Sequence, residues 1–139
     1  MRKIILLFLT IIFSIATIAQ TNSLRNILIF NVIGINYELH LKNGEKSYGD
    51  NKPITDGRKV IFDFDNNTIY VQKNVYSPFK IINHFTAQNT TIYSVVFDVI
   101  GRDKKPAKLQ LVLLNYRALL YIQLNNRPEL LYVYDLAYE

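Results

Sequence analysis

Apolar and polar residues alternate with a period of two along the last third of the chain, from Thr91 to Leu136. Successive side chains of a β-strand point to opposite faces, so this alternation predicts strands that each have one apolar face. The aligned apolar residues are Tyr93, Val95, Phe97 and Val99 in the run 91–100, and Leu109, Leu111 and Leu113 in the run 108–114. Two more such runs are 119–124 and 130–136, and the polar turns lie at 101–106, 115–117 and 125–128. Short turns join antiparallel neighbours, so the pattern predicts a meander of four strands.

The middle of the chain carries the same pattern in shorter form. Residues 58–72 predict a hairpin with its turn at 65–68, and its first strand aligns Val60, Phe62 and Phe64. A further strand is predicted at 79–85, followed by a loop at 86–89. Earlier, the alternating run 35–41 precedes Asn43-Gly44, a dipeptide suited to a tight hairpin turn because both central residues need positive φ. In that run we expect four side chains to face inward: Ile35, Tyr37, Leu39 and Leu41.

Two upstream regions are less regular. Residues 45–57 are polar and contain glycine and proline, so they predict a loop or a short irregular strand. Residues 26–33 are strongly apolar, and their isoleucine and valine favour a strand. The alternative is a short helix beginning near Ser23, in which Leu24, Ile27 and Leu28 would share a face.

Together these runs predict an all-β, single-domain antiparallel meander of about eight strands. Sequential hairpins favour an up-and-down barrel or a strongly curled sheet, and a β-sandwich is the alternative. The outline is similar to that of lipocalin-like barrels. The chain has no tryptophan, however, and therefore lacks the Gly-x-Trp element that marks true lipocalins, so we assign no family.

The N-terminus has the three parts of a secretory signal peptide: the basic residues Arg2 and Lys3, an apolar run over 4–18, and small residues before Gln20. We expect residues 1–19 to be cleaved and residues 20–139 to form one β-domain that is exported to the periplasm or outside the cell. An uncleaved anchor helix is the alternative, but the apolar run is short for a bilayer span of about 20 residues. After cleavage we do not expect an integral membrane protein.

Charge and cysteine content narrow the functional classes. Removing Arg2 and Lys3 lowers the formal net charge from +5 to +3, so the exported part is only weakly basic. Together with export, this argues against a nucleic-acid partner. The chain has no cysteine, which excludes disulfides, thiolate metal sites and cysteine nucleophiles, and which favours a bacterial origin for so small an exported domain.

Few residues suggest chemistry. Asp63, Asp65 and Asn67 resemble the start of a calcium loop, but Thr68 and Asn74 stand where that loop needs glycine and glutamate. His40 and His84 are far apart in the sequence, and no serine lies in a Gly-x-Ser-x-Gly motif. The carboxylates Asp63, Asp98 and Asp135 are expected to point outward and keep the sheet soluble. The basic run 102–108 is interpreted as a solvated hairpin tip. We therefore predict no catalytic residue, no metal and no cofactor, and expect a binding protein rather than an enzyme.

Two binding modes follow. In the first, a small apolar or amphipathic molecule lies inside the barrel, whose walls would be Val60, Phe62, Phe64, Tyr93, Val95, Phe97, Leu109, Leu111 and Leu113. In the second, an exposed tyrosine-rich sheet face binds an envelope protein or glycan. Tyrosines for such a face are concentrated late in the chain at Tyr116, Tyr121, Tyr132, Tyr134 and Tyr138. A filled or a hollow barrel interior would discriminate between the two modes.

Overall fold

The computed structural model describes residues 26–89 and 92–139, and within these ranges the chain forms strands and turns with no helix. The predicted signal peptide and Thr91 lie outside the described residues. The strands are β1 (Ile27–His40), β2 (Lys46–Tyr48), β3 (Lys52–Pro53), β4 (Lys59–Asp63), β5 (Thr68–Val71), β6 (Phe79–Asn89), β7 (Ile92–Ile100), β8 (Pro106–Leu113), β9 (Ala118–Leu124) and β10 (Leu130–Tyr138). The four predicted strands of the last third are thus confirmed as β7 to β10.

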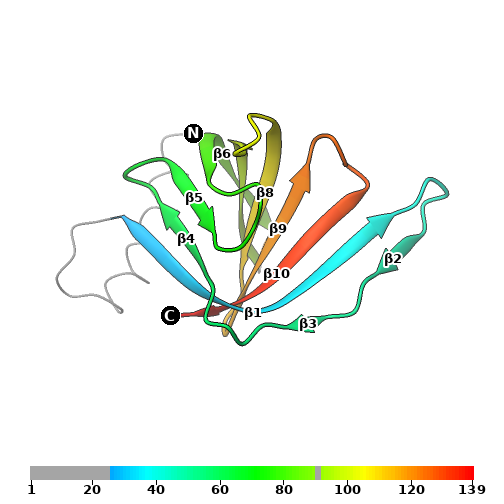
Figure 1. Ribbon diagram of the computed structural model, residues 1–139, viewed down its shortest axis with the longest axis horizontal. Coiled ribbons are helices and arrows are strands. Elements are labelled where there is room, and N and C mark those ends of the chain that lie inside the picture. Colours follow the sequence, from blue (N-terminus) through cyan, green and yellow to red (C-terminus); the bar gives the residue numbers. More distant parts are fainter. Residues whose placement is uncertain (1–25, 90–91) are drawn as a thin grey trace.

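The strands close into an antiparallel barrel (Figure 1). Along the sheet the order is β10-β9-β8-β7-β6-β5-β4-β1, and a further pairing of β10 with β1 joins the two ends. Eight strands therefore form a closed up-and-down barrel, and β2 and β3 are two additional short strands on β1. The predicted all-β barrel is confirmed, and the sandwich alternative is wrong.

β1 belongs to two parts of the molecule. Its first residues pair with β4, from Ile27 opposite Asp63 to Asn31 opposite Lys59. From Phe30 onward β1 also pairs with β10, with a register shift between Val32 and Gly34, and the second half of β1 pairs with β2 and β3 on its other side. In Figure 1 this second half extends to the right, beside β2 and away from the barrel. We call residues 35–41, β2, β3 and residues 130–134 the wing. The helix alternative for residues 26–33 is wrong for β1, because Ile27 to Ile33 lie in this strand.

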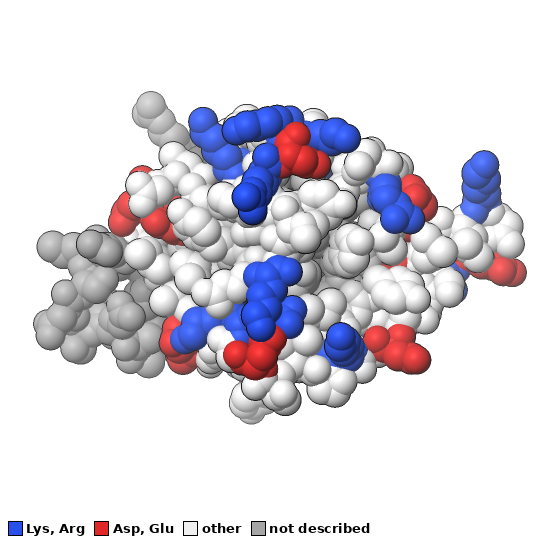
Figure 2. Space-filling view, in the orientation of Figure 1, with Lys and Arg blue, Asp and Glu red and all other residues white. Residues whose placement is uncertain are grey.

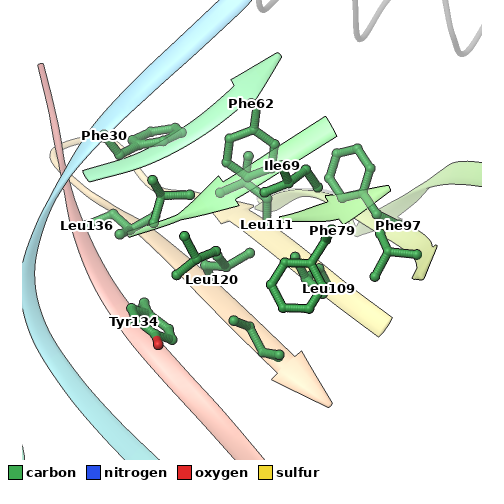
Figure 3. Close-up of a cluster of buried hydrophobic side chains, with 14 of the residues drawn as sticks. Phe30, Phe62, Ile69, Phe79, Phe97, Leu109, Leu111, Leu120, Tyr134 and Leu136 are labelled. Atoms are coloured by element: carbon green, nitrogen blue, oxygen red, sulfur yellow. The ribbon is translucent and has the colours of Figure 1, made fainter. Parts of the chain in front are cut away.

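The barrel core follows from the period-two alternation of its strands. β9, for example, alternates strictly, with Ala118, Leu120, Ile122 and Leu124 buried and the residues between them half-buried. Figure 3 shows aromatic and aliphatic side chains from several barrel strands pointing toward one another. The ring centroids of Phe30 and Phe62 are 5.9 Å apart at 81°, an edge-to-face contact that aromatic pairs favour.

A turn forms at Asn43-Gly44 as predicted, but the expectation that both residues have positive φ is wrong, because Asn43 does not. Gly44 has φ +84° in the turn between β1 and β2, a conformation that glycine adopts without strain. One loop prediction is wrong, because residues 86–89 continue β6 and pair with β7, ending with Asn89 opposite Ile92. The side chains there are not strongly apolar, so the backbone ladder with β7 decides the conformation.

Candidate functional site

The predicted pocket walls meet in the middle of the barrel. Six of the nine side chains have accessible fractions of 0 or 1%: Val60, Phe62, Val95, Phe97, Leu109 and Leu111. A side chain that borders an internal cavity large enough for a water molecule would have some accessible surface. These six side chains have almost none, so neighbouring atoms touch them on every side. A small apolar molecule could enter the centre of the barrel only by pushing these side chains apart. The centre of the barrel is therefore a packed core.

The other three predicted residues lie towards the rim. Phe64 and Leu113 are half-buried and pack against the core, and the ring of Phe64 lies 6.0 Å from that of Phe62. Tyr93 lies on the same face of β7 as Val95 but is 44% exposed, so the prediction that it lines the barrel interior is wrong. The reason is that β5 pairs with β6 only near Phe79, whereas the β6–β7 hairpin continues well past that point. Tyr93 lies on this projecting part and has no strand of the barrel across from it.

The inner face of the sheet continues from the core onto the wing. Ile35, Tyr37 and Leu39 of β1 lie directly opposite Tyr134, Tyr132 and Leu130 of β10, and residues in register share a face. Side chains on this face are more exposed on the wing than in the barrel. Tyr134 is buried, whereas Tyr132 is half-buried and Tyr37, opposite it, is 46% exposed. The expectation that Tyr37 and Leu41 are buried inside the barrel is therefore wrong: both are exposed, because the wing extends past the end of the barrel.

The backbone of Gly49 lies against the ring of Tyr37. A Cβ atom built on Gly49 would be 2.1 Å from Cε1 of Tyr37, and the Gly49 N–H donates a hydrogen bond of 2.9 Å to the Tyr37 carbonyl. Only a residue without a side chain allows the ring to lie there. The ring thus rests on the edge of the wing.

The late tyrosines do not form one exposed face. Tyr134 accepts a hydrogen bond of 2.9 Å from Asn74 Nδ2, and the hydroxyl of Tyr138 donates one of 2.7 Å to the Leu114 carbonyl. Burial raises the pKa of both phenols. Tyr121 is half-buried on the outer face, where burial and then the charge of Glu38 raise its pKa. Tyr116 is 93% exposed in the β8–β9 turn. The tyrosines available to a partner on the inner face are therefore Tyr132 and Tyr37, and Tyr37 lies outside the late cluster.

The histidines and carboxylates do not converge. Nε2 of His40 is 3.2 Å from Oε2 of Glu38, whereas the ring of His84 lies 6.2 Å from that of Phe97. Asp63 accepts hydrogen bonds from the backbone N–H and the side-chain amide of Asn66, so it shapes the β4–β5 turn. Among residues 26–89 and 92–139, no three His, Asp or Glu side chains form a group able to hold a metal ion.

A depression of about 390 Å³ lies on the outer surface where three loops meet. We call it the cationic depression, and its lining residues are Asn66, Thr68, Pro78, Lys80, Ile100, Gly101, Arg102 and Lys104. Figure 2 shows basic side chains gathered at the top of the molecule, over the β7–β8 turn that supplies part of this lining. The sequence of the 102–108 run predicts only a solvated hairpin tip. The depression cannot be predicted from that run because Lys80 and Thr68 come from other strands.

Two other basic residues, Arg58 and Lys73, share one carboxylate. Oδ2 of Asp56 lies 2.7 Å from Nη2 of Arg58 and 2.7 Å from Nζ of Lys73. The Arg58 guanidinium, followed by the Lys73 ammonium, holds the pKa of the Asp56 carboxyl well below its usual range. This cluster is a satisfied ionic contact between two loops.

Nothing in the part of the chain that the structure describes forms a long apolar helix of the kind that crosses a bilayer. Comparison of the chain with protein-family models, curated proteins and solved structures finds no significant match. The functional argument therefore rests on the geometry described above.

Proposed function

We propose that the protein is an exported, non-catalytic binding protein that uses the inner face of the wing to bind a partner protein. Export rests on the signal-like sequence of residues 1–19. The observation that carries the binding mode is the contrast between a packed barrel centre and an apolar sheet face that continues from it into solvent. The alternative of a small apolar ligand inside the barrel has no space at the centre to support it.

The residues of this face suit a protein partner. Tyr37, Leu39 and Leu41 present rings and aliphatic groups, and aromatic side chains are enriched at protein interfaces. Contact with Gly49 limits the freedom of the Tyr37 ring before binding, which reduces the entropy lost when a partner docks. Apart from the phenol hydroxyls of the tyrosines, the only polar side chain that β2 adds to this face is Ser47, opposite Leu39, so the face offers few partners for the hydroxyls of a glycan.

The edge of the wing is poorly suited to strand addition. β2 has three residues and begins with Lys46, and β3 consists of Lys52 and Pro53. Short strands, lysines and proline are features that discourage pairing with a further strand. The partner should therefore dock on the face of the wing rather than extend the sheet.

Site-specific photocrosslinking tests this proposal. The variant Tyr37→p-benzoylphenylalanine, expressed in its native host, should give one discrete adduct that excess unlabelled protein suppresses. Unlabelled Tyr37→Ser protein should need at least a tenfold higher concentration to suppress the adduct to the same extent. The matched control is the same photoreactive residue at the highly exposed Tyr116, which should give no such adduct. Equal suppression by both competitors, an adduct with glycan, or adducts of equal intensity from both positions would refute the proposal.

A further inference from the structure

We propose that the cationic depression is a second binding site, one that takes the phosphate group of a small phosphate ester or of a lipid headgroup. It is separate from the wing and does not depend on the function proposed for it. The proposal rests on the way the depression is built, the charges that line it, and its size.

The floor of the depression is a row of residues in register. Thr68 of β5 lies opposite Lys80 of β6, and Lys80 lies opposite Ile100 of β7. Ile69, Phe79 and Val99, their neighbours along the strands, are buried in the core, so alternation directs the row outward. The floor therefore lies on the rigid wall of the barrel.

The rim is held in place by backbone hydrogen bonds. The N–H of Arg102 donates to the carbonyl of Tyr76 at 2.8 Å, which joins the β7–β8 turn to the loop before β6. The N–H of Lys104 donates to the Gly101 carbonyl at 3.0 Å, and Lys104 has φ +66°, a left-handed conformation that is uncommon for lysine. The positions of Arg102 and Lys104 are thus fixed by the fold before any ligand arrives.

The residues that line the depression carry positive charge, and no lining carboxylate balances it. Lys80, Arg102 and Lys104 all line the depression, no carboxylate lines it, and none of the three cations is in an ion pair with a described residue. The carboxylates of the adjoining turns keep their charge but do not line the depression: Asp63 accepts a hydrogen bond from Asn66, and Asp103 accepts one from the N–H of Lys105 at 3.1 Å. Arg58 and Lys73, in contrast, share Asp56. Mutual repulsion of the three cations is relieved by a dianion such as phosphate.

Size and lining favour an ester over a bare ion. A volume of about 390 Å³ is within the range of small-molecule sites, about 300–1,000 Å³. Pro78 and Ile100 supply an apolar side against which the carbon part of an ester can pack. Lysine and arginine together offer many N–H donors to phosphate oxygens.

The test is an amide-resolved NMR titration of the protein with glycerol 3-phosphate at constant ionic strength, with sodium chloride as the blank. We expect saturable shifts confined to the lining residues. Lys80→Gln should weaken binding about tenfold, because it removes one charge-assisted contact. Lys105→Gln and Lys42→Gln remove the same charge outside the lining and should change affinity less than twofold, and Tyr37→Ser should leave it unchanged.

Vesicles of phosphatidic acid and phosphatidylcholine in a 1:3 ratio distinguish the two sources of phosphate. Cosedimentation that is lost in Lys80→Gln identifies a lipid headgroup, whereas glycerol 3-phosphate binding without cosedimentation identifies a soluble ester. Absence of saturable shifts and of cosedimentation would overturn the proposal. Equal weakening by all three cation variants would also overturn it, since that result indicates net charge rather than a site. Circular dichroism of each variant checks that it is folded.

Discussion

Truncating Phe97 to alanine should strongly destabilise the barrel. Phe97 has no accessible surface, and its ring lies 5.6 Å from Phe62, 6.3 Å from Phe64 and 6.2 Å from His84. Phe62 lies on β4, which is paired with β1 on one side and with β5 on the other, so the walls would collapse only partly into the space left by the ring. Phe→Ala substitutions in such cores cost about 3–5 kcal/mol in unfolding free energy, a large part of the roughly 5–15 kcal/mol of a whole domain.

The assay is urea unfolding followed by far-ultraviolet circular dichroism, with Phe85→Ala as the matched control. Phe85 lies on the neighbouring strand but is 48% exposed, so its truncation should cost only about 1 kcal/mol. If Phe97→Ala is too unstable to purify, Phe97→Leu should still cost about 1 kcal/mol or more. Equal costs for Phe97→Ala and Phe85→Ala would refute the reasoning, because a side chain that borders empty space has few contacts to lose.

Three other outcomes follow from individual contacts. Asp56→Asn should lower the urea midpoint at pH 7 but not well below pH 2: the pKa of Asp56 is depressed by Arg58, so its contribution is present above about pH 4 and lost as the pH falls through the folded-state pKa. A difference between the two proteins that does not change with pH would contradict this. Tyr134→Phe removes a buried hydrogen bond and should cost about 1–2 kcal/mol in unfolding free energy, and no measurable loss would show that the bond contributes nothing. Gly49→Ala should displace the ring of Tyr37, seen as a change in its aromatic proton shifts, while far-ultraviolet circular dichroism is unchanged; unaltered shifts would be incompatible with the contact.

Local pattern was enough to predict most strands and turns. The alternation of apolar and polar residues over 91–136 can be read from residues that are adjacent in the sequence, and β7 to β10 lie where it predicts strands. Asn43-Gly44 likewise marks the position of the turn between β1 and β2, although only Gly44 has the positive φ that was predicted for both residues. The prediction failed at 86–89, where pairing with a partner strand outweighs the side-chain pattern.

The sites depend on long-range register and could not be predicted in this way. Closure of the barrel requires Phe30 to lie opposite Tyr138, more than a hundred residues away. The wing exists because β1 and β10 stay paired as far as Leu39, well beyond the last residue of β1 that pairs with β4. Similarly, Lys80 joins Arg102 in one depression only because β6 pairs with β7 in a particular register. Whether the inward-facing side chains surround a cavity or form a packed core depends on the diameter of the barrel and on the volume of those side chains. The alternation of apolar and polar residues gives neither quantity.

The barrel centre is filled, and binding takes place outside it, on the inner face of the wing and in the cationic depression. Xenon-pressurised crystals test the filling of the centre most directly, because xenon enters apolar cavities that already exist. We expect no xenon peak among Phe62, Phe97 and Leu111 in the wild-type protein and a clear peak at that position in Phe97→Ala. A wild-type peak there would contradict the account and restore the barrel interior as the binding site.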